Sequence, residues 1–326
     1  MIKSWKVSVL AATLLGSCLL TTAAQAADAV NVRFSWKLKG EYAGFYVAKE
    51  QGLFADQGLD VHLGEGAGSS AALSGLVQGE EDLVVMPGVF ALSAISQGMP
   101  VKIVALYHPA APLGILSFPD NPVRTPADLE GKSLPTSPGD TVTSYLPVFC
   151  KINQIDCGKI KLVSLNTDAR TSMFMTKRID AIGSYLNVDA PILDSMVKTP
   201  FVRLDLAKYG LVLPGLAVVA SDKVIADKPG MVTRFLSALN QGTEVAIRDP
   251  QEAAKDISKD WAAPPKPAIL VAQIKATTAA IPVTEGKPMG YVQEAALTQA
   301  LTLLSGADSD MKVLPVADYY TNALLP

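Results

Sequence analysis

The chain has 326 residues, of which 49% are hydrophobic, and this is enough for two domains that each have a core. The 28 basic and 31 acidic residues give a formal net charge of −3 and form no basic stripe, which argues against a nucleic-acid-binding protein. Glycine and proline are spread along the chain, so no segment has the composition of a disordered tail.

The first 26 residues predict an export signal. Two lysines lie within the first six residues, and residues 7–20 form an apolar stretch that is short for a membrane span. Residues 24–26, Ala-Gln-Ala, have the small-residue pattern of a cleavage site. We therefore expect residues 1–26 to be a secretory signal peptide that is cut after Ala26, and the mature protein to be periplasmic.

A lipid anchor is the alternative for this end of the chain. Residues 15–18, Leu-Gly-Ser-Cys, resemble a bacterial lipobox, which would make Cys18 a lipid-modified N-terminus. The apolar run continues beyond Cys18, and this favours the signal peptide. No later segment of the sequence is long and apolar enough for a transmembrane helix.

Two cysteines, Cys150 and Cys157, remain in the mature chain. In an exported protein, an even pair that lies close in sequence favours a disulfide, and two free buried thiols are the alternative. The only histidines are His62 and His108, and neither cysteine has a C-x-x-C partner. The sequence therefore predicts no metal site.

A strand, a loop and a helix open the mature chain. Residues 30–34 predict a strand that ends just before Trp36, and residues 42–52 predict a helix. The loop between them carries Glu41 and ends at Tyr42. Free N–H groups at a helix start attract polar ligand groups, and aromatic rings at a strand end offer a stacking surface. We interpret this stretch as the first wall of a small-molecule cleft, and the alternative is a packed helix with Trp36 in the core.

Three more strands and two more helices are predicted before residue 108. The strands cover residues 58–63, 83–86 and 101–107, and the helices cover residues 71–78 and 89–97. This alternation predicts a parallel sheet with helices on its faces, and such sheets bind ligands at the carboxyl ends of their strands. The candidate ligand residues at these ends are Ser69, Ser70, Pro87, Gly88, Tyr107 and His108.

Several of these candidates have a structural alternative. Ser69 or Ser70 follows a glycine-rich turn and could serve only as a helix N-cap. No Gly-Lys-Ser/Thr follows the turn, so it is not a P-loop. His108 is a candidate for a hinge or surface position as well as for ligand contact, whereas His62 lies within a predicted strand and is expected to be structural.

The pattern changes after residue 108. A proline-rich passage, residues 108–126, predicts a crossing into a second domain. The predicted strands there cover residues 114–118, 132–135, 161–165, 181–184 and 201–206, and the predicted helices cover residues 141–153, 169–177 and 189–196. The candidate ligand residues in this part are Asp140, Thr141, Tyr185 and Asn187, with helix capping as the alternative for Asp140.

A second crossing, residues 211–220, returns the chain to the first group of strands. Helices are then predicted over residues 229–248, 250–261, 267–280 and 291–305, with prolines at or near several starts. The sequence therefore predicts an α/β protein with two β/α lobes, residues 27–112 plus 215–326 and residues 113–214. Two crossings imply a hinge, and the facing strand ends imply a ligand cleft between the lobes.

The order and spacing of several motifs resemble one known family. The resemblance begins at Trp36 and runs through the predicted first helix into Gly-Leu-Asp-Val at residues 58–61. It continues at residues 125–132, 178–182 and 249–254, and the residues that match in the first stretch are Trp36, Tyr42, Gly44, Tyr46, Val47, Ala48, Gly52 and Phe54. The family is the thiamine-precursor-type (NMT/THI-like) substrate-binding proteins, which are related to the sulfonate, taurine and nitrate binders of ABC importers.

This resemblance implies a type II periplasmic-binding-protein fold and delivery of a small ligand to an ABC importer permease. It does not fix the ligand, because residues 37–39, Lys-Leu-Lys, stand where thiamine-pyrimidine binders usually carry Pro-Asn, and Tyr42 stands at a usual histidine. Fungal enzymes of the family use a histidine and a cysteine-rich motif that this sequence lacks. We therefore expect a binding protein, with no catalytic residue, metal or cofactor.

The candidate residues suggest a small polar or aromatic ligand. The rings of Trp36, Tyr42, Tyr107 and Tyr185 favour a flat or cationic group, and Glu41 favours an amine or amidine. The helix starts at residues 69–70 and 139–141 favour an anionic group instead. Pyrimidines, amines, sulfonates and aromatic acids stay open, as do an enzyme of the same fold and a ligand-sensing subunit of a membrane receptor. We expect a monomer that closes over its ligand.

Overall fold

A computed structural model describes residues 1, 27–137, 139–307 and 310–326 of the chain. The predicted signal peptide and the alternative lipid-anchor cysteine, Cys18, lie outside the described residues. Within the described part of the chain, no helix is both long and apolar enough to cross a membrane.

The first sheet has five strands in the order β2-β1-β3-β10-β4. Strand β1 pairs in parallel with β2 and β3, whereas β10 is antiparallel to both β3 and β4. The strands are β1 (Asp28–Phe34), β2 (Leu59–Gly64), β3 (Leu83–Pro87), β4 (Val101–Leu106) and β10 (Leu216–Ser221). The expected parallel sheet is thus mixed, because the returning chain enters at the carboxyl end of β3, where Leu216 lies opposite Pro87.

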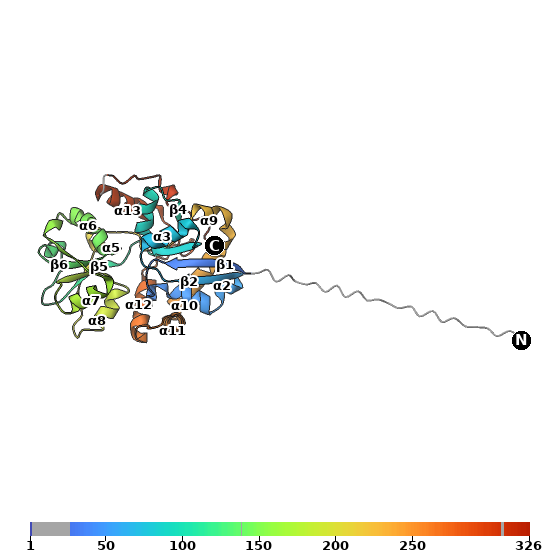
Figure 1. Cartoon of the computed structure of the whole chain (residues 1–326), viewed down its shortest axis with the longest axis horizontal. Coiled ribbons are helices and arrows are strands. Elements are labelled where there is room, and N and C mark those ends of the chain that lie inside the picture. The colour runs from blue at the N-terminus through green and yellow to red at the C-terminus, as the bar shows by residue number, and fades with distance from the viewer. Residues whose placement is uncertain (2–26, 138, 308–309) are drawn as a thin grey trace.

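Helices cover both faces of this sheet (Figure 1). They are α1 (Ala43–Glu50), α2 (Leu53–Asp56), α3 (Ser69–Gln78), α4 (Gly88–Ser96), α9 (Asp222–Asp227), α10 (Pro229–Arg248), α11 (Pro250–Lys259) and α12 (Pro267–Ala279). Glycines let α1 and α10 approach closely, since a Cβ atom on Gly242 would lie 2.3 Å from the carbonyl oxygen of Gly44. The long apolar stripe of α10 buries Phe235 and Leu239 in the same core.

A second sheet has the order β8-β5-β9 and is antiparallel throughout. Its strands are β5 (Leu113–Ser117), β8 (Ala181–Tyr185) and β9 (Val202–Asp205), and a separate parallel pair is formed by β6 (Ser133–Thr136) and β7 (Lys161–Ser164). The helices of this part are α5 (Thr141–Ser144), α6 (Leu146–Asn153), α7 (Thr167–Met175) and α8 (Asp189–Asp194).

The single helix that we predicted over residues 141–153 is two helices in the structure. The chain leaves helical geometry at Tyr145, and α6 begins with Pro147 in its first turn. Proline has no N–H to donate within a continuing helix, so it favours a new start at this point. A disulfide joins Cys150 of this helix to Cys157, and their Cα atoms lie 5.7 Å apart.

Short 3₁₀ helices occupy several loops. They cover Gly40–Tyr42, Pro126–Leu129, Cys157–Lys159, Ala207–Tyr209 and Val316–Asp318. The first of them is the next element after β1 and continues into α1, so the predicted helix start near Tyr42 is a tighter turn that leads into the α-helix.

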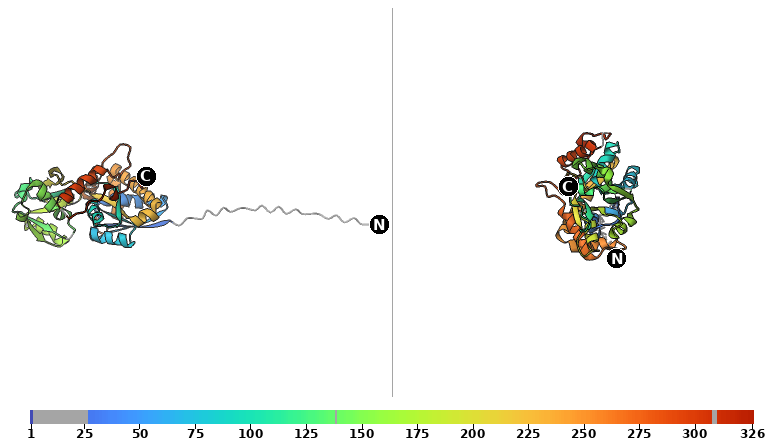
Figure 2. Two further views of the ribbon diagram at one scale, coloured as in Figure 1. Left: turned by 90° about the horizontal axis from the view of Figure 1, so that it is seen from above. Right: turned by 90° about the vertical axis from the view of Figure 1, so that its left-hand side faces the viewer.

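The two groups of strands lie side by side along the long axis of the molecule (Figures 1 and 2). All strands before residue 107 and β10 belong to the first group, and strands β5–β9 belong to the second. On this separation we propose a first lobe of residues 27–112 plus 215–326 and a second lobe of residues 113–214. The late helix α13 (Glu294–Ala307) extends toward the second lobe, where Lys151 donates a hydrogen bond to the carbonyl oxygen of Gly306.

Candidate functional site

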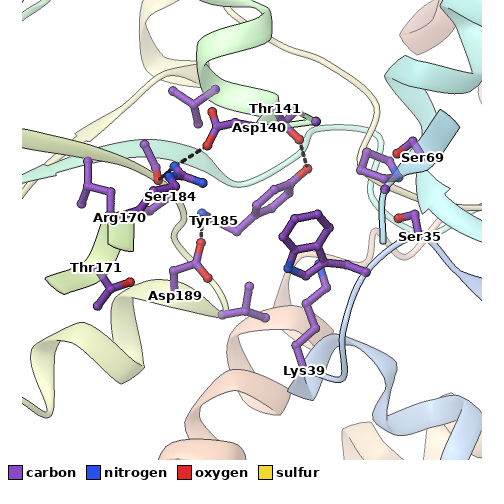
Figure 3. Close-up of a pocket in the computed structure, with 18 of the residues that line it drawn as sticks. Ser35, Lys39, Ser69, Asp140, Thr141, Arg170, Thr171, Ser184, Tyr185 and Asp189 are labelled. Carbon is purple, nitrogen blue, oxygen red and sulfur yellow. Dashed lines mark hydrogen bonds and ion pairs between the residues drawn. The ribbon is translucent and has the colours of Figure 1, made fainter. Parts of the chain in front are cut away.

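A cavity of about 230 Å³ lies between the two proposed lobes, where both groups of strands present their loops. Figure 3 shows Ser35, Ser69 and Lys39 on one side of it and Arg170, Thr171 and Asp189 on the other. The full wall also includes Trp36, Gly68, Pro87, Phe90, Gly139, Asp140, Thr141, Val142, Ile182, Gly183, Ser184, Tyr185, Val188, Ile192 and Leu193. The site thus draws on residues that are far apart in sequence.

Six of the predicted ligand residues line this cavity: Trp36, Ser69, Pro87, Asp140, Thr141 and Tyr185. Seven others lie outside it: Glu41, Tyr42, Ser70, Gly88, Tyr107, His108 and Asn187. Each of the seven has an identifiable structural environment.

The two tyrosines outside the cavity are core residues. Tyr42 stacks on Phe34 with a ring-centroid distance of 4.1 Å and an interplanar angle of 17°. Tyr107 is buried, and its hydroxyl donates to Oδ1 of Asn240 at 2.8 Å. Burial raises the pKa of Tyr42 to about 12, which keeps its hydroxyl protonated. Neither ring is free to stack on a ligand, because each is already covered by first-lobe side chains.

Ser70 and Gly88 are held apart from the cavity by the local backbone. The N-cap of α3 is Gly68, with φ of 134°, and Ser69 and Ser70 are the first two helical residues. Ser69 therefore faces the cavity without capping the helix, whereas Ser70 is exposed on the next helical position. Gly88 begins α4, where a Cβ atom would lie 2.9 Å from Cβ of Pro214, so it provides a close approach to the second crossing.

A buried polar cluster explains the positions of Glu41, His108 and Asn187. The Nδ2 atom of Asn187 lies 3.0 Å from Oγ1 of Thr277 and 3.4 Å from Oε1 of Glu41. Nε2 of His108 lies 3.0 Å from the carbonyl oxygen of Thr277, so it carries the proton and donates. We call Glu41, His108, Asn187 and Thr277 the sealed cluster, because each is less than a tenth exposed.

The sealed cluster joins four parts of the chain, and His108 follows β4. Glu41 follows β1, Thr277 lies on α12, and Asn187 comes from the loop after β8 in the second lobe. Because His108 is fully buried, it is not a surface residue, and it does not line the cavity. Burial lowers the pKa of His108 despite the nearby Glu41 carboxylate, so the ring is neutral near pH 7.

Lys39 lines the cavity, although we did not include it among the sequence candidates. Its Nζ atom lies 2.6 Å from Oε2 of Glu41 and faces two rings, at 4.9 Å from the centroid of Tyr185 and 5.2 Å from that of Tyr42. Burial by itself would lower the pKa of Lys39, but Glu41 and the two tyrosines outweigh it and hold that pKa above its ordinary value. The pKa of Glu41 is correspondingly lowered, mainly by Lys39 against the effect of burial.

The second-lobe wall contains another ion pair, between Arg170 and Asp140. Asp140 is also the N-cap of α5, where it accepts hydrogen bonds from the backbone N–H of Thr143 at 2.7 Å and from its hydroxyl at 2.8 Å. One guanidinium nitrogen of Arg170 also donates to the carbonyl oxygen of Gly183 at 3.3 Å. Sequence reasoning missed Arg170, because an arginine within a polar helix gives no signal of facing a cavity.

Asp189, like Lys39 and Arg170, lines the cavity without having been a sequence candidate. One of its carboxylate oxygens accepts a hydrogen bond from the backbone N–H of Tyr185 at 2.7 Å, and the side chain lines the cavity (Figure 3). Burial raises the pKa of this carboxyl above its ordinary value, and the basic groups Lys39 and Arg170 oppose that rise only in part. An acidic residue in the first turn of a helix is ordinary, so its sequence position carried no functional signal.

The described residues hold no group of three or more His, Cys, Asp or Glu side chains that could bind a metal ion. The hydroxyl of Tyr185 is hydrogen-bonded to Oγ1 of Thr141 at 3.0 Å, and this fixes the Tyr185 ring in the middle of the cavity wall. The arrangement offers a small molecule the ring of Tyr185 and the cations Lys39 and Arg170, which are paired with carboxylates. It also offers Asp189, which forms no ion pair among the described residues.

Comparison with known families gives a match that covers most of the chain. The family model described as NMT1/THI5 like matches residues 39–253. The chain belongs to the NMT1/THI5-like family. This confirms the resemblance that its motifs indicate.

Two relatives of this NMT1/THI5-like protein are named for different functions, one for binding and one for synthesis. The formylaminopyrimidine-binding protein of Halalkalibacterium halodurans is 25% identical over 259 residues, which is 77% of each chain. The 4-amino-5-hydroxymethyl-2-methylpyrimidine phosphate synthase of Candida albicans is 24% identical over 244 residues, which is 67% of each chain.

Solved structures show the fold of this NMT1/THI5-like chain. The periplasmic aliphatic sulphonate binding protein SsuA from Escherichia coli superposes with a TM-score of 0.70 at 16% identity, and the match covers 91% of this chain and 99% of that one. The protein therefore has the α/β periplasmic-binding-protein fold that the sequence predicts.

Proposed function

We propose that this protein is an extracytoplasmic substrate-binding protein that captures a small polar or aromatic ligand between its two lobes and delivers it to an ABC importer. The observation that carries the proposal is the cavity itself. It is lined from both lobes, it is large enough for a single-ring molecule, and polar groups and rings converge on it.

The wall favours a flat ligand that can donate hydrogen bonds. Trp36, Phe90 and Tyr185 line the cavity and offer ring faces. Asp189 has one carboxylate oxygen bound to the backbone, and its other oxygen is available to accept from a ligand N–H group. An amine, amidine or amino-substituted ring would supply that donor.

The names of two relatives support a binding role. The Escherichia coli protein of the same fold is named as a periplasmic sulphonate binder, and the Halalkalibacterium halodurans relative as a formylaminopyrimidine binder. The predicted export signal agrees with a binding protein that works outside the cytoplasm. The importer permease is then the macromolecular partner, and the loaded, closed form is what it would recognise.

An enzyme is the second candidate, because one relative is named as a synthase. The cavity gives it little support. No cysteine or histidine is among the described residues that line it, and Lys39 is held as a cation by Glu41. A protonated amine is not a nucleophile, so this lysine is better suited to positioning a ring than to forming a covalent intermediate.

Native mass spectrometry of the protein freshly released from the periplasm tests the proposal. We expect a bound small molecule that is lost on denaturation and has the same mass after prolonged incubation with the protein. We also expect the loaded protein to stimulate ATP hydrolysis by its cognate ABC importer reconstituted in liposomes. Absence of both a bound molecule and stimulation would contradict transport, and chemical conversion of the molecule would favour the enzyme.

A further inference from the structure

Two buried donors on the second-lobe wall lack a partner. Nε of Arg170 and the hydroxyl of Ser184 have no hydrogen-bonding group within reach among the described residues. Both residues line the cavity, and their side chains lie on the same side of it (Figure 3). Buried polar groups in native proteins are nearly always hydrogen-bonded, so a pair of unsatisfied donors facing a cavity indicates that a ligand atom satisfies them.

The surrounding structure fixes this pair in place. Ser184 is 3% exposed and belongs to β8, and Arg170 is anchored on the preceding residue of that strand through the carbonyl oxygen of Gly183. The guanidinium also pairs with Asp140, which is itself held by two hydrogen bonds to Thr143. The Nε–H group is therefore presented by a side chain whose other end has little freedom to move.

The charges around the cavity decide which acceptor fits. Its two cations, Lys39 and Arg170, are each already paired, with Glu41 and Asp140 respectively. Asp189 adds a carboxyl group with no basic partner within ion-pair distance among the described residues. The described wall thus has no unpaired positive charge. A carboxylate or sulfonate would lose its hydration on binding without meeting a cation that lacks a partner.

We propose that Arg170 and Ser184 form a subsite that donates hydrogen bonds to a neutral acceptor of the ligand, such as a carbonyl oxygen. This subsite selects against carboxylates and sulfonates. This inference rests on the proposed binding function and names the ligand class more closely. The ligand is a small flat molecule with a donor for Asp189 and a neutral acceptor for Arg170 and Ser184. The sulphonate-binding relative of the same fold therefore does not share its ligand class with this protein.

Three ring-matched probes test the subsite by isothermal titration. They are 4-aminopyrimidines that carry a carboxamide, a carboxylate or a methyl group at position 5, so that only the group at this position changes. We expect the carboxamide to bind at least about tenfold more tightly than the other two, because a hydrogen bond from a charged donor is worth that much or more. In the Ser184→Ala variant we expect most of this preference to disappear.

Ser137→Ala is the matched control. Its hydroxyl is also buried and without a hydrogen-bonding partner in the described part of the chain, but it does not line the cavity. The control should keep the full carboxamide preference. Arg170→Lys, which keeps the charge for Asp140 but removes the Nε–H group, should lose it.

Three results would overturn the subsite: tightest binding of the carboxylate, an unchanged preference in both Ser184→Ala and Arg170→Lys, or no binding of any probe. None of these would by itself contradict the binding function, which the co-purified ligand and the permease assay test separately. If the protein carries a small molecule and stimulates the permease while the probes fail, only the subsite is wrong.

Discussion

Two polar clusters meet at Lys39, and they have opposite kinds of unsatisfied atoms. In the sealed cluster, the buried atoms without a hydrogen-bonding partner among the described residues are Nδ1 of His108 and Oδ1 of Asn187, which are acceptors. On the cavity wall they are Nε of Arg170 and the hydroxyl of Ser184, which can donate. A ligand in the 230 Å³ cavity can satisfy the donors of Arg170 and Ser184, whereas His108 and Asn187 do not line that cavity. We infer that the cavity wall binds the ligand and that the sealed cluster holds the two lobes in register.

The largest expected effect comes from breaking the ion pair that links the two clusters. Glu41→Gln leaves the Lys39 cation buried without a compensating charge, so we expect the free energy of unfolding to fall by about 3–5 kcal/mol. Urea denaturation of the ligand-free protein measures this. The control is Glu50→Gln, which removes a partly exposed carboxylate paired with Lys49 and Lys259 and should cost about 1 kcal/mol or less. Equal effects of the two variants would contradict the role given to Glu41.

The two aromatic residues of the first loop should separate stability from binding. Tyr42→Ala removes a core ring that stacks on Phe34, so we expect a loss of about 3–5 kcal/mol of unfolding free energy. Trp36→Ala removes a partly exposed ring from the cavity wall, so we expect a smaller loss of stability and a weaker hold on the co-purified ligand. Denaturation curves and ligand titrations of both variants make the comparison. Wild-type ligand affinity in Trp36→Ala would show that the ring does not contact the ligand.

Asp189→Asn tests the carboxylate of the cavity wall. We expect affinity for an aminopyrimidine probe to fall by about 1.5–3 kcal/mol, because a hydrogen bond to a charged acceptor is lost. The unfolding free energy near pH 7 should stay the same or rise. Burial raises the pKa of Asp189 in the folded protein, so this carboxyl lowers stability as the pH rises from its ordinary pKa to the raised one. A large loss of stability with unchanged affinity would place Asp189 in a structural role instead.

The smallest effect concerns the pH dependence of the sealed cluster. The pKa of His108 is lowered in the folded protein, so the unfolded chain binds the proton more readily. Stability should therefore be fully present above about pH 6.5 and decrease below it, by at most about 1.4 kcal/mol per pH unit. The charged groups that face the ring are Glu41 and Lys39, and both keep their charge in this range. Unfolding curves between pH 7.5 and 5.5 should show a shallower loss in His108→Gln, and identical slopes would contradict this role.

The sequence predicts the architecture well because periodicity and turn residues are local. Strands β1 and β3 and helix α10 lie close to their predicted ranges, since apolar alternation, glycines and prolines mark them directly. The antiparallel placement of β10 between β3 and β4 could not be predicted in this way. It depends on where the second crossing re-enters the sheet, and that is a property of the whole fold.

The cavity wall was predictable only where a lining residue stands beside a recognisable element end. Trp36, Ser69 and Thr141 met that condition and line the cavity. Arg170 and Asp189 lie within ordinary helical sequence, and only packing turns them toward the cavity. Glu41 and His108 looked like ligand residues because polar side chains near strand ends are usually exposed, but the approach of α12 and of the loop after β8 covers them.

A crystal structure with the ligand retained from the periplasm tests the proposed site most directly. We predict a flat molecule in the 230 Å³ cavity, with a neutral acceptor atom about 3 Å from both Nε of Arg170 and the hydroxyl of Ser184 and a donor on Asp189. Lys39 should still be paired with Glu41. A ligand bound outside this cavity, or a carboxylate or sulfonate seated against Arg170, would contradict the account.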